Sequence, residues 1–125
     1  MDRQSDLFAL VEHRLGWIER RQAVLAQNVA NANTPGYIAR DIEPFAASMS
    51  KVNAGLYQTN VSHLASTLLT SKPDWRTHPS ERSPDGNAVS LNEELTKIAD
   101  TESAQALVTN LYRKYIGLFR TAIGK

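Results

Sequence analysis

The chain has 125 residues, no cysteine and a formal net charge of +1 from 14 basic and 13 acidic residues. This length suits one domain, and the lack of cysteine excludes disulfides, thiolate catalysis and thiolate metal sites. The near-neutral charge gives no electrostatic reason to expect nucleic acid or an anionic membrane as partner, and no segment approaches the length of a membrane span.

The first predicted element is an amphipathic helix over residues 1–33. Apolar residues recur at alternating spacings of three and four, and only Gln22 interrupts the series. This heptad pattern is typical of a helix that packs along a partner helix, although spacing alone equally allows a surface helix of a small bundle. The polar Gln22 could set the register of such a pairing. The residues expected to pack are Leu7, Val11, Leu15, Ile18, Leu25 and Val29.

A turn and junction motif follows at residues 34–45. Pro35 fixes its own φ and disfavours helical dihedrals at Thr34, while Gly36 readily takes positive φ. Thr34–Tyr37 is therefore predicted to form a type II turn that ends the helix.

Asparagines cluster at this junction, and asparagine suits helix ends and turns better than helix interiors. Asn28 and Asn31 share one helix face. Two roles are open for them: to satisfy the last helical carbonyls, or to hydrogen-bond a neighbouring copy. The junction residues singled out are Asn31, Asn33, Thr34, Pro35, Gly36, Tyr37 and Arg40.

Residues 46–89 are predicted to be irregular. Asn, Gly and Pro residues separate short apolar clusters such as Val61–Leu69, which argues against a long helix and favours loops with a short strand or hairpin. Trp75 lies in a proline-rich stretch and is interpreted as a local plug, with a partner anchor as the alternative.

A second long helix is predicted over residues 90–125, with Ser90 and Glu93 forming a capping box. At about 100° per residue its apolar side chains cover an arc of about 180°, which is more than one partner helix would cover. Either the middle segment or another subunit is expected to cover the remaining apolar surface, so self-association is one of two open hypotheses. The residues expected to pack on this helix are Leu107, Leu111, Tyr115, Leu118 and Ile123.

Motifs for catalysis or metal binding are not found in the sequence. His13, His63 and His78 lie in three different segments, without the spacing that places two ligands on one helix face. Neither a G-x-S-x-G motif nor a P-loop is present. The adjacent Glu93 and Glu94 are explained by the dipole at a helix start. We therefore expect no enzyme, no metal and no cofactor.

The run LAQNVANANTPGYIARDI, residues 25–42, resembles the signature of the bacterial flagellar rod and hook protein family. The short length, Arg40 with Asp41, the DGNAV run and the ending NLYRKYIGLFRTAIGK point within that family to a proximal rod subunit. Another rod subunit such as FlgC is the alternative, and a soluble helical adaptor is a further one. The chain departs from the family pattern at Ser90, Thr101, Ala104 and Ala106.

The predicted fold is mainly α and a single domain overall, with long N- and C-terminal amphipathic helices pairing as a coiled-coil-like bundle around an irregular middle segment. The resemblance implies a non-enzymatic building block that self-assembles through its terminal helices into the rod, which crosses the periplasm as the flagellar drive shaft. It implies as partners other copies of the chain, other rod subunits, the rod-base adaptor protein, the membrane ring and the flagellar export gate, with no nucleic acid and no direct membrane insertion. It also implies type III export without a cleaved signal peptide, which fits the acids within the first apolar stretch.

Overall fold

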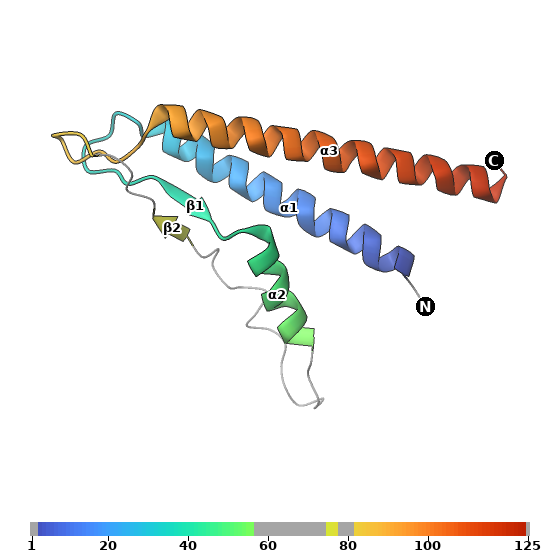
Figure 1. The fold of residues 1–125 in the computed structure, drawn as a ribbon. Helices are drawn as coiled ribbons and strands as arrows, with labels where there is room; N and C mark the ends of the chain where they lie inside the picture. Colours follow the sequence, from blue (N-terminus) through green and yellow to red (C-terminus); the bar gives the residue numbers. More distant parts are fainter. Residues whose placement is uncertain (1–2, 57–74, 78–81, 125) are drawn as a thin grey trace.

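The computed structural model describes residues 3–56, 75–77 and 82–124. Two long helices lie side by side and antiparallel, with the junction loops at one end, the loop end (Figure 1). The two described chain ends lie together at the other end, the terminal end. The elements in chain order are α1 (Arg3–Ala30), β1 (Arg40–Ile42), α2 (Phe45–Leu56), β2 (Trp75–Thr77) and α3 (Leu91–Ile123).

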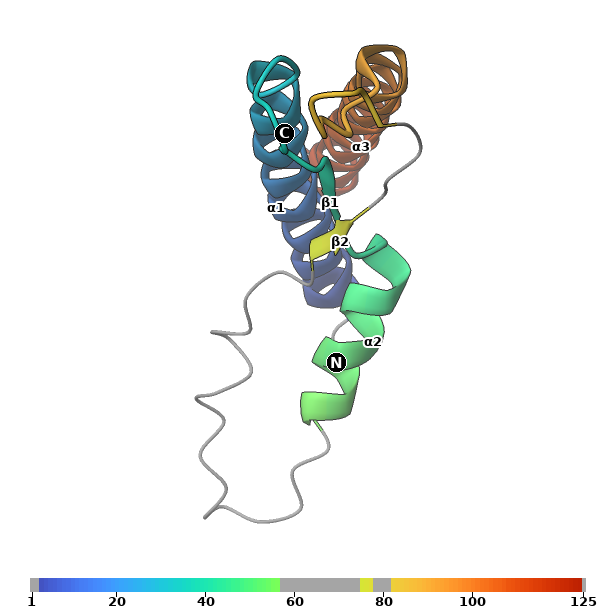
Figure 2. The ribbon, with the colours of Figure 1, turned by 90° about the vertical axis from the view of Figure 1, so that its left-hand side faces the viewer.

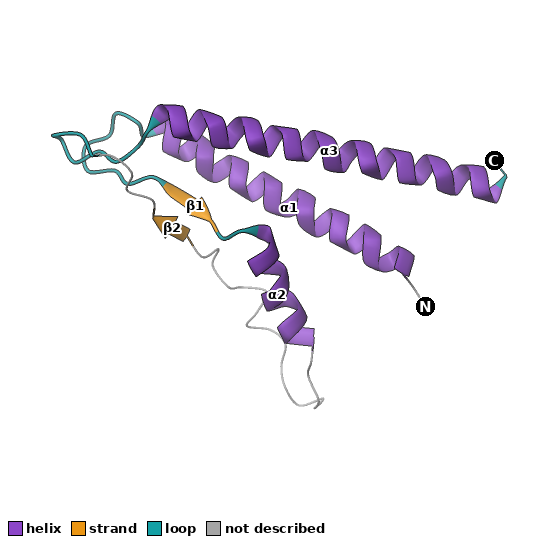
Figure 3. Cartoon of the chain, viewed as in Figure 1, coloured by secondary structure: helices purple, strands orange, loops and turns teal. Residues whose placement is uncertain are grey.

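The predicted mainly α fold with paired terminal helices is confirmed (Figure 3). Helix α1 ends at Ala30, slightly before the predicted boundary, because the Asn31 N–H is shared between the carbonyls of Gln27 and Asn28. Shared donors of this kind tighten the last turn of a helix. At the far end of α3, Gly124 has a φ of +78° and ends the helix just after Ile123.

The core lies between the two long helices and the strand that follows α1. Ile18 is fully buried in a cluster with Trp17, Val24 and Ile42. From α3, Ala104 and Val108 pack against this cluster. The core is thus centred on the half of α1 nearer the loop end, where three chain segments meet.

The middle segment contains a helix that the sequence analysis did not predict. Helix α2 spans twelve residues and projects away from the pair of long helices (Figures 1 and 2). Before α2, β1 pairs antiparallel with β2, and Ile42 is opposite Trp75. Trp75 is thereby placed in a strand. The predicted apolar cluster Val61–Leu69, with His63 and His78, lies outside the described residues.

Candidate functional site

The turn after α1 has the geometry that the sequence predicts. The Tyr37 N–H donates to the Thr34 carbonyl over 3.2 Å, and Gly36 has a φ of +71°. A positive φ at the third residue is the requirement of a type II turn, and L side chains disfavour it. The chain therefore reverses here and leads into β1.

The loop that precedes α3 packs directly onto this turn. The Gly36 N–H donates to the Asp85 carbonyl over 3.1 Å, and the Ala88 N–H donates to the Tyr37 carbonyl over 2.8 Å. A parallel β-bridge joins Ile38 to Ala88. The two loops consequently form one unit that joins the end of α1 to the start of α3.

The side chain of Asn87 fastens the two loops together. Asn87 is buried, and its amide donates to the carbonyls of Asn31 over 3.1 Å and Thr34 over 2.7 Å. Its side-chain oxygen accepts from the Val89 N–H over 3.0 Å. Burial of an amide is favourable only when its donors and acceptor are paired, as they are here. Sequence analysis did not single out Asn87, although it lies in the DGN turn.

A second buried amide, Asn28, forms the centre of a network that we call the Asn28 hub (Asn28, Tyr37, Arg40, Glu94 and Lys97). Its nitrogen donates to the Arg40 carbonyl and, over 2.8 Å, to the Glu94 carboxylate. Its oxygen accepts from the Arg40 N–H over 3.0 Å and the Tyr37 hydroxyl over 3.3 Å. Glu94 is 1% exposed and also accepts from the Lys97 ammonium over 2.7 Å. This network joins α1, β1 and α3 through side chains rather than through apolar contact.

The two roles left open for the asparagines can now be compared. Asn31 takes the local role, because its amide donates to the Gln27 carbonyl over 2.8 Å and its oxygen accepts from the Thr34 hydroxyl. Asn28 takes neither role, since its partners lie in the turn, β1 and α3 of the same chain. Asn33 is exposed.

The capping box predicted at the start of α3 is only partly present. Ser90 occupies the N-cap position with an extended backbone, but in the part of the chain that the structure describes its side chain makes no capping hydrogen bond. The Ser90 carbonyl instead accepts the first helical N–H, that of Glu94. The first turn is held from inside by the buried Glu94 carboxylate, whereas Glu93 is exposed. The hydrogen bond from the Asn28 amide to the Glu94 carboxylate thus positions the first turn of α3 against α1.

The predicted packing residues of α1 face the interior. A hydrogen bond of 2.9 Å joins the Gln22 and Gln105 side chains across the two long helices, at the position that the sequence analysis suggested for setting register. Of the apolar residues, Val11, Ile18 and Leu25 are buried, and Leu7, Leu15 and Val29 are half-buried.

The predicted packing residues of α3 are, by contrast, mostly open to solvent. Leu107 is 70% exposed, Leu118 62%, Ile123 58% and Leu111 56%. Of this set only Tyr115 is half-buried. The described part of the middle segment leaves these side chains open to solvent, because α2 projects away from the helix pair (Figure 1).

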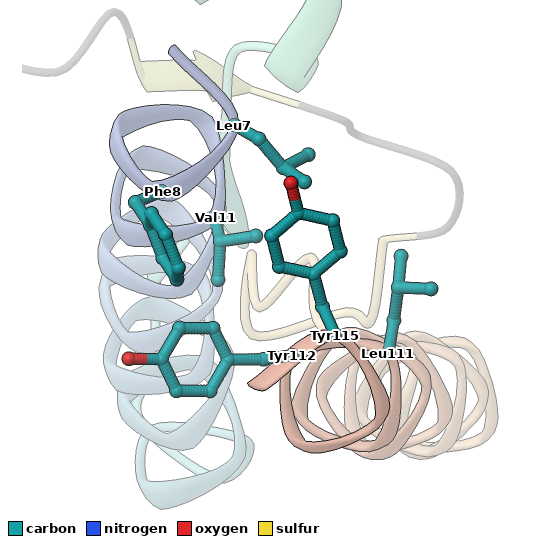
Figure 4. A pocket seen from close by; sticks show the side chains of 6 residues that line it. All are labelled: Leu7, Phe8, Val11, Leu111, Tyr112 and Tyr115. Carbon is teal, nitrogen blue, oxygen red and sulfur yellow. The ribbon is translucent and has the colours of Figure 1, made fainter. Parts of the chain in front are cut away.

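At the terminal end, aromatic side chains join the two helices. Figure 4 shows Phe8 of α1 facing Tyr112 and Tyr115 of α3, with both ring centroids 5.7 Å from that of Phe8 in edge-to-face geometry. Edge-to-face pairs of this kind are favourable beyond their buried area. They surround a small notch lined by Leu7, Phe8, Val11, Leu111, Tyr112 and Tyr115.

Chemical sites are not evident in the described ranges. Among residues 3–56, 75–77 and 82–124, no group of three or more acidic, histidine or cysteine side chains is placed to hold a metal ion. Among the same residues, no helix has both the length and the apolarity to cross a membrane. The features that stand out are the joined loops, the Asn28 hub and the exposed leucines of α3.

Comparison with known proteins identifies relatives across most of the chain. A family model described as "Flagella basal body rod protein" matches residues 19–37, which span the second half of α1 and the turn. The flagellar basal body rod protein FlgB of Agrobacterium fabrum (strain C58) is 34% identical over 115 residues, covering 87% of this chain and 86% of the relative. FlgB of Escherichia coli (strain K12) is 35% identical over 112 residues, and FlgB of Salmonella typhimurium 33% over 111, each covering 80% of both chains.

Proposed function

Because the chain belongs to the FlgB family of flagellar basal body rod proteins, we propose that it builds the proximal rod by packing its terminal helices against those of neighbouring subunits. As a family member it is a structural subunit of the rod. The observation that carries the proposed packing is the row of exposed leucines Leu107, Leu111 and Leu118 on α3.

These leucines lie on a flank of α3 that α1 leaves mostly exposed, although Leu111 also lines the notch beside Phe8 and Val11. At about 100° per residue they are grouped within an arc of about 40°, beside the arc of Ala104 and Val108, which pack against the core. Burial of a leucine side chain is worth about 1.5–3 kcal/mol, so a row of three is a substantial drive for association. An exposed apolar row of this kind is typical of an interaction surface.

The proposal includes the partners and location that the family suggests. Other copies of this chain and other rod subunits would contact the leucine row, and the rod-base adaptor, the membrane ring and the export gate would be further partners. The proposed location is the periplasmic rod, reached by export without a cleaved signal peptide. Since the relatives are named FlgB, the sister subunit FlgC and a soluble adaptor are less favoured alternatives.

Aspartate substitutions within the leucine row test this proposal. In a strain that lacks the chromosomal copy, Leu111→Asp and Leu118→Asp should give folded, exported protein but no motility, because a charge would enter an apolar interface. Asn110→Asp is the matched control, since Asn110 is an exposed polar residue of the same helix. Motility in soft agar, circular dichroism of the purified chain and electron microscopy of basal bodies are the measurements. Normal rods and swimming with Leu111→Asp would contradict the proposed packing.

A further inference from the structure

The chain after the turn runs back along α1 and is fastened to it at successive points. We call residues 40–45 the strap. Its first residue, Arg40, is bound through its backbone by Asn28. Further along, the Asp41 carboxylate accepts from the Arg21 guanidinium in two hydrogen bonds of 3.0 and 2.9 Å. A two-point pair of this kind fixes orientation as well as distance.

The strap is held again close to the start of α2. The Trp17 indole N–H donates to the Glu43 carbonyl over 2.8 Å. Next to it, the Arg14 guanidinium lies 4.8 Å from the Trp17 ring centroid and 4.7 Å from that of Phe45, the first residue of α2. The two rings meet edge to face at 6.1 Å. Cation–π and aromatic contacts therefore hold the first turn of α2 on α1.

The contacts to the strap and the contacts to α3 use neighbouring faces of α1, and Asn28 reaches both. The residues that hold the strap, Trp17, Arg21 and Asn28, are spaced by four and seven and so share one side of the helix. The neighbouring side, with Ile18 and Gln22, faces α3. Figure 2 shows α2 leaving the helix pair below α1 and clear of α3.

We propose that the strap joins α1 and α2 into one rigid body within the single subunit, so that the direction of α2 is set before any neighbour binds. The contacts at Asn28, Arg21 and Trp17 span three turns of α1, which resists both bending and rotation of the strap. The contacts of the strap all lie within one chain, so this rigid body forms whether or not the subunit assembles as proposed.

Spin-label distances in the purified chain test the strap. The chain has no cysteine, so Glu19→Cys on α1 and Ser50→Cys on α2, both at exposed positions, can be labelled selectively. Double electron–electron resonance should give one narrow distance distribution. Arg21→Ala should broaden it about twofold or more, because the charge-assisted pair that orients the strap is lost. Arg20→Ala, an exposed neighbour, is the matched control and should leave the width unchanged.

Two further variants keep the test decisive if Arg21→Ala unfolds. Arg21→Lys keeps the charge but loses the two-point geometry, so an intermediate width is expected. Trp17→Phe keeps the ring but removes the indole donor to Glu43 and should broaden the distribution without loss of helical circular dichroism. A broad distribution in the labelled parent, or equal widths for the Arg20 and Arg21 variants, would overturn the proposal.

Discussion

Replacement of Asn28 tests the hub that joins the two terminal helices. Its hydrogen bond to the Glu94 carboxylate is worth about 1.5–3 kcal/mol, and each of its neutral hydrogen bonds about 0.5–1.5 kcal/mol. Water can replace part of the hydrogen bonding that the backbone of the exposed Arg40 loses. The buried Glu94 carboxylate, by contrast, retains the hydrogen bond from the Lys97 ammonium. We therefore expect Asn28→Ala to lower the free energy of unfolding by about 3–5 kcal/mol.

Asn28→Asp is a more specific test, because it preserves the size of the side chain but replaces the amide donor with a carboxylate acceptor. An oxygen would replace the nitrogen that donates to the Glu94 carboxylate, which sets two acceptors, and two negative charges, against each other. The loss should exceed that of the alanine variant and approach the whole stability of a small domain. Asn33→Ala and Asn33→Asp are the controls and should stay within about 0.5 kcal/mol, since Asn33 is exposed. Urea unfolding followed by far-ultraviolet circular dichroism measures the series. If Asn28→Asp is as stable as Asn28→Ala, the assigned donation to Glu94 is refuted.

Two pairs of substitutions separate backbone from core effects. Gly36→Val should lower the free energy of unfolding by at least about 1–2 kcal/mol, because valine disfavours the positive φ of this position. Gly117→Ala should instead raise it by about 0.5–1 kcal/mol, because a Cβ there meets open space. An unchanged melting temperature for Gly36→Val would contradict the turn assignment. Ile18→Ala should cost about 2–5 kcal/mol because Ile18 is fully buried. Leu107→Ala should cost less than about 0.5 kcal/mol in the isolated chain, and equal losses at the two positions in urea unfolding would contradict the placement of the core.

The features predictable from sequence are those that local chemistry determines. Pro35 and Gly36 determine the turn between them, and the observed positive φ lies at the glycine as expected. The helices follow from apolar periodicity, and α3 ends at Ile123, two residues before the predicted boundary, because Gly124 takes positive φ. Patterns that repeat within a few residues are read from the sequence directly.

The polar network could not be predicted, because its partners are far apart in the chain. Asn28 and Glu94 are separated by 66 residues, and neither position has a local signature for the other. The helix dipole explains why acidic residues occur in the first turn of α3, but it does not predict that Glu94 is buried while Glu93 is exposed. Burial depends on how α1 and α3 meet, and this is a property of the fold.

Helix α2 was missed for a different reason. The Asn, Gly and Pro residues of the middle segment argue against a long helix, yet Asn53 and Gly55 lie in the last turns of α2, where such residues are tolerated. The apolar spacing of Phe45, Met49 and Val52 was a helical signal that the sequence analysis did not weigh.

The position of both described chain ends at one pole of the helix pair bears on how the chain can be tagged (Figure 1). A fluorescent protein or affinity tag fused at either end would stand beside the exposed leucines at the terminal end of α3. A small dye on α2 would stand well away from them. If the leucine row is the assembly surface that we propose, α2 is therefore the better site of attachment for imaging in living cells.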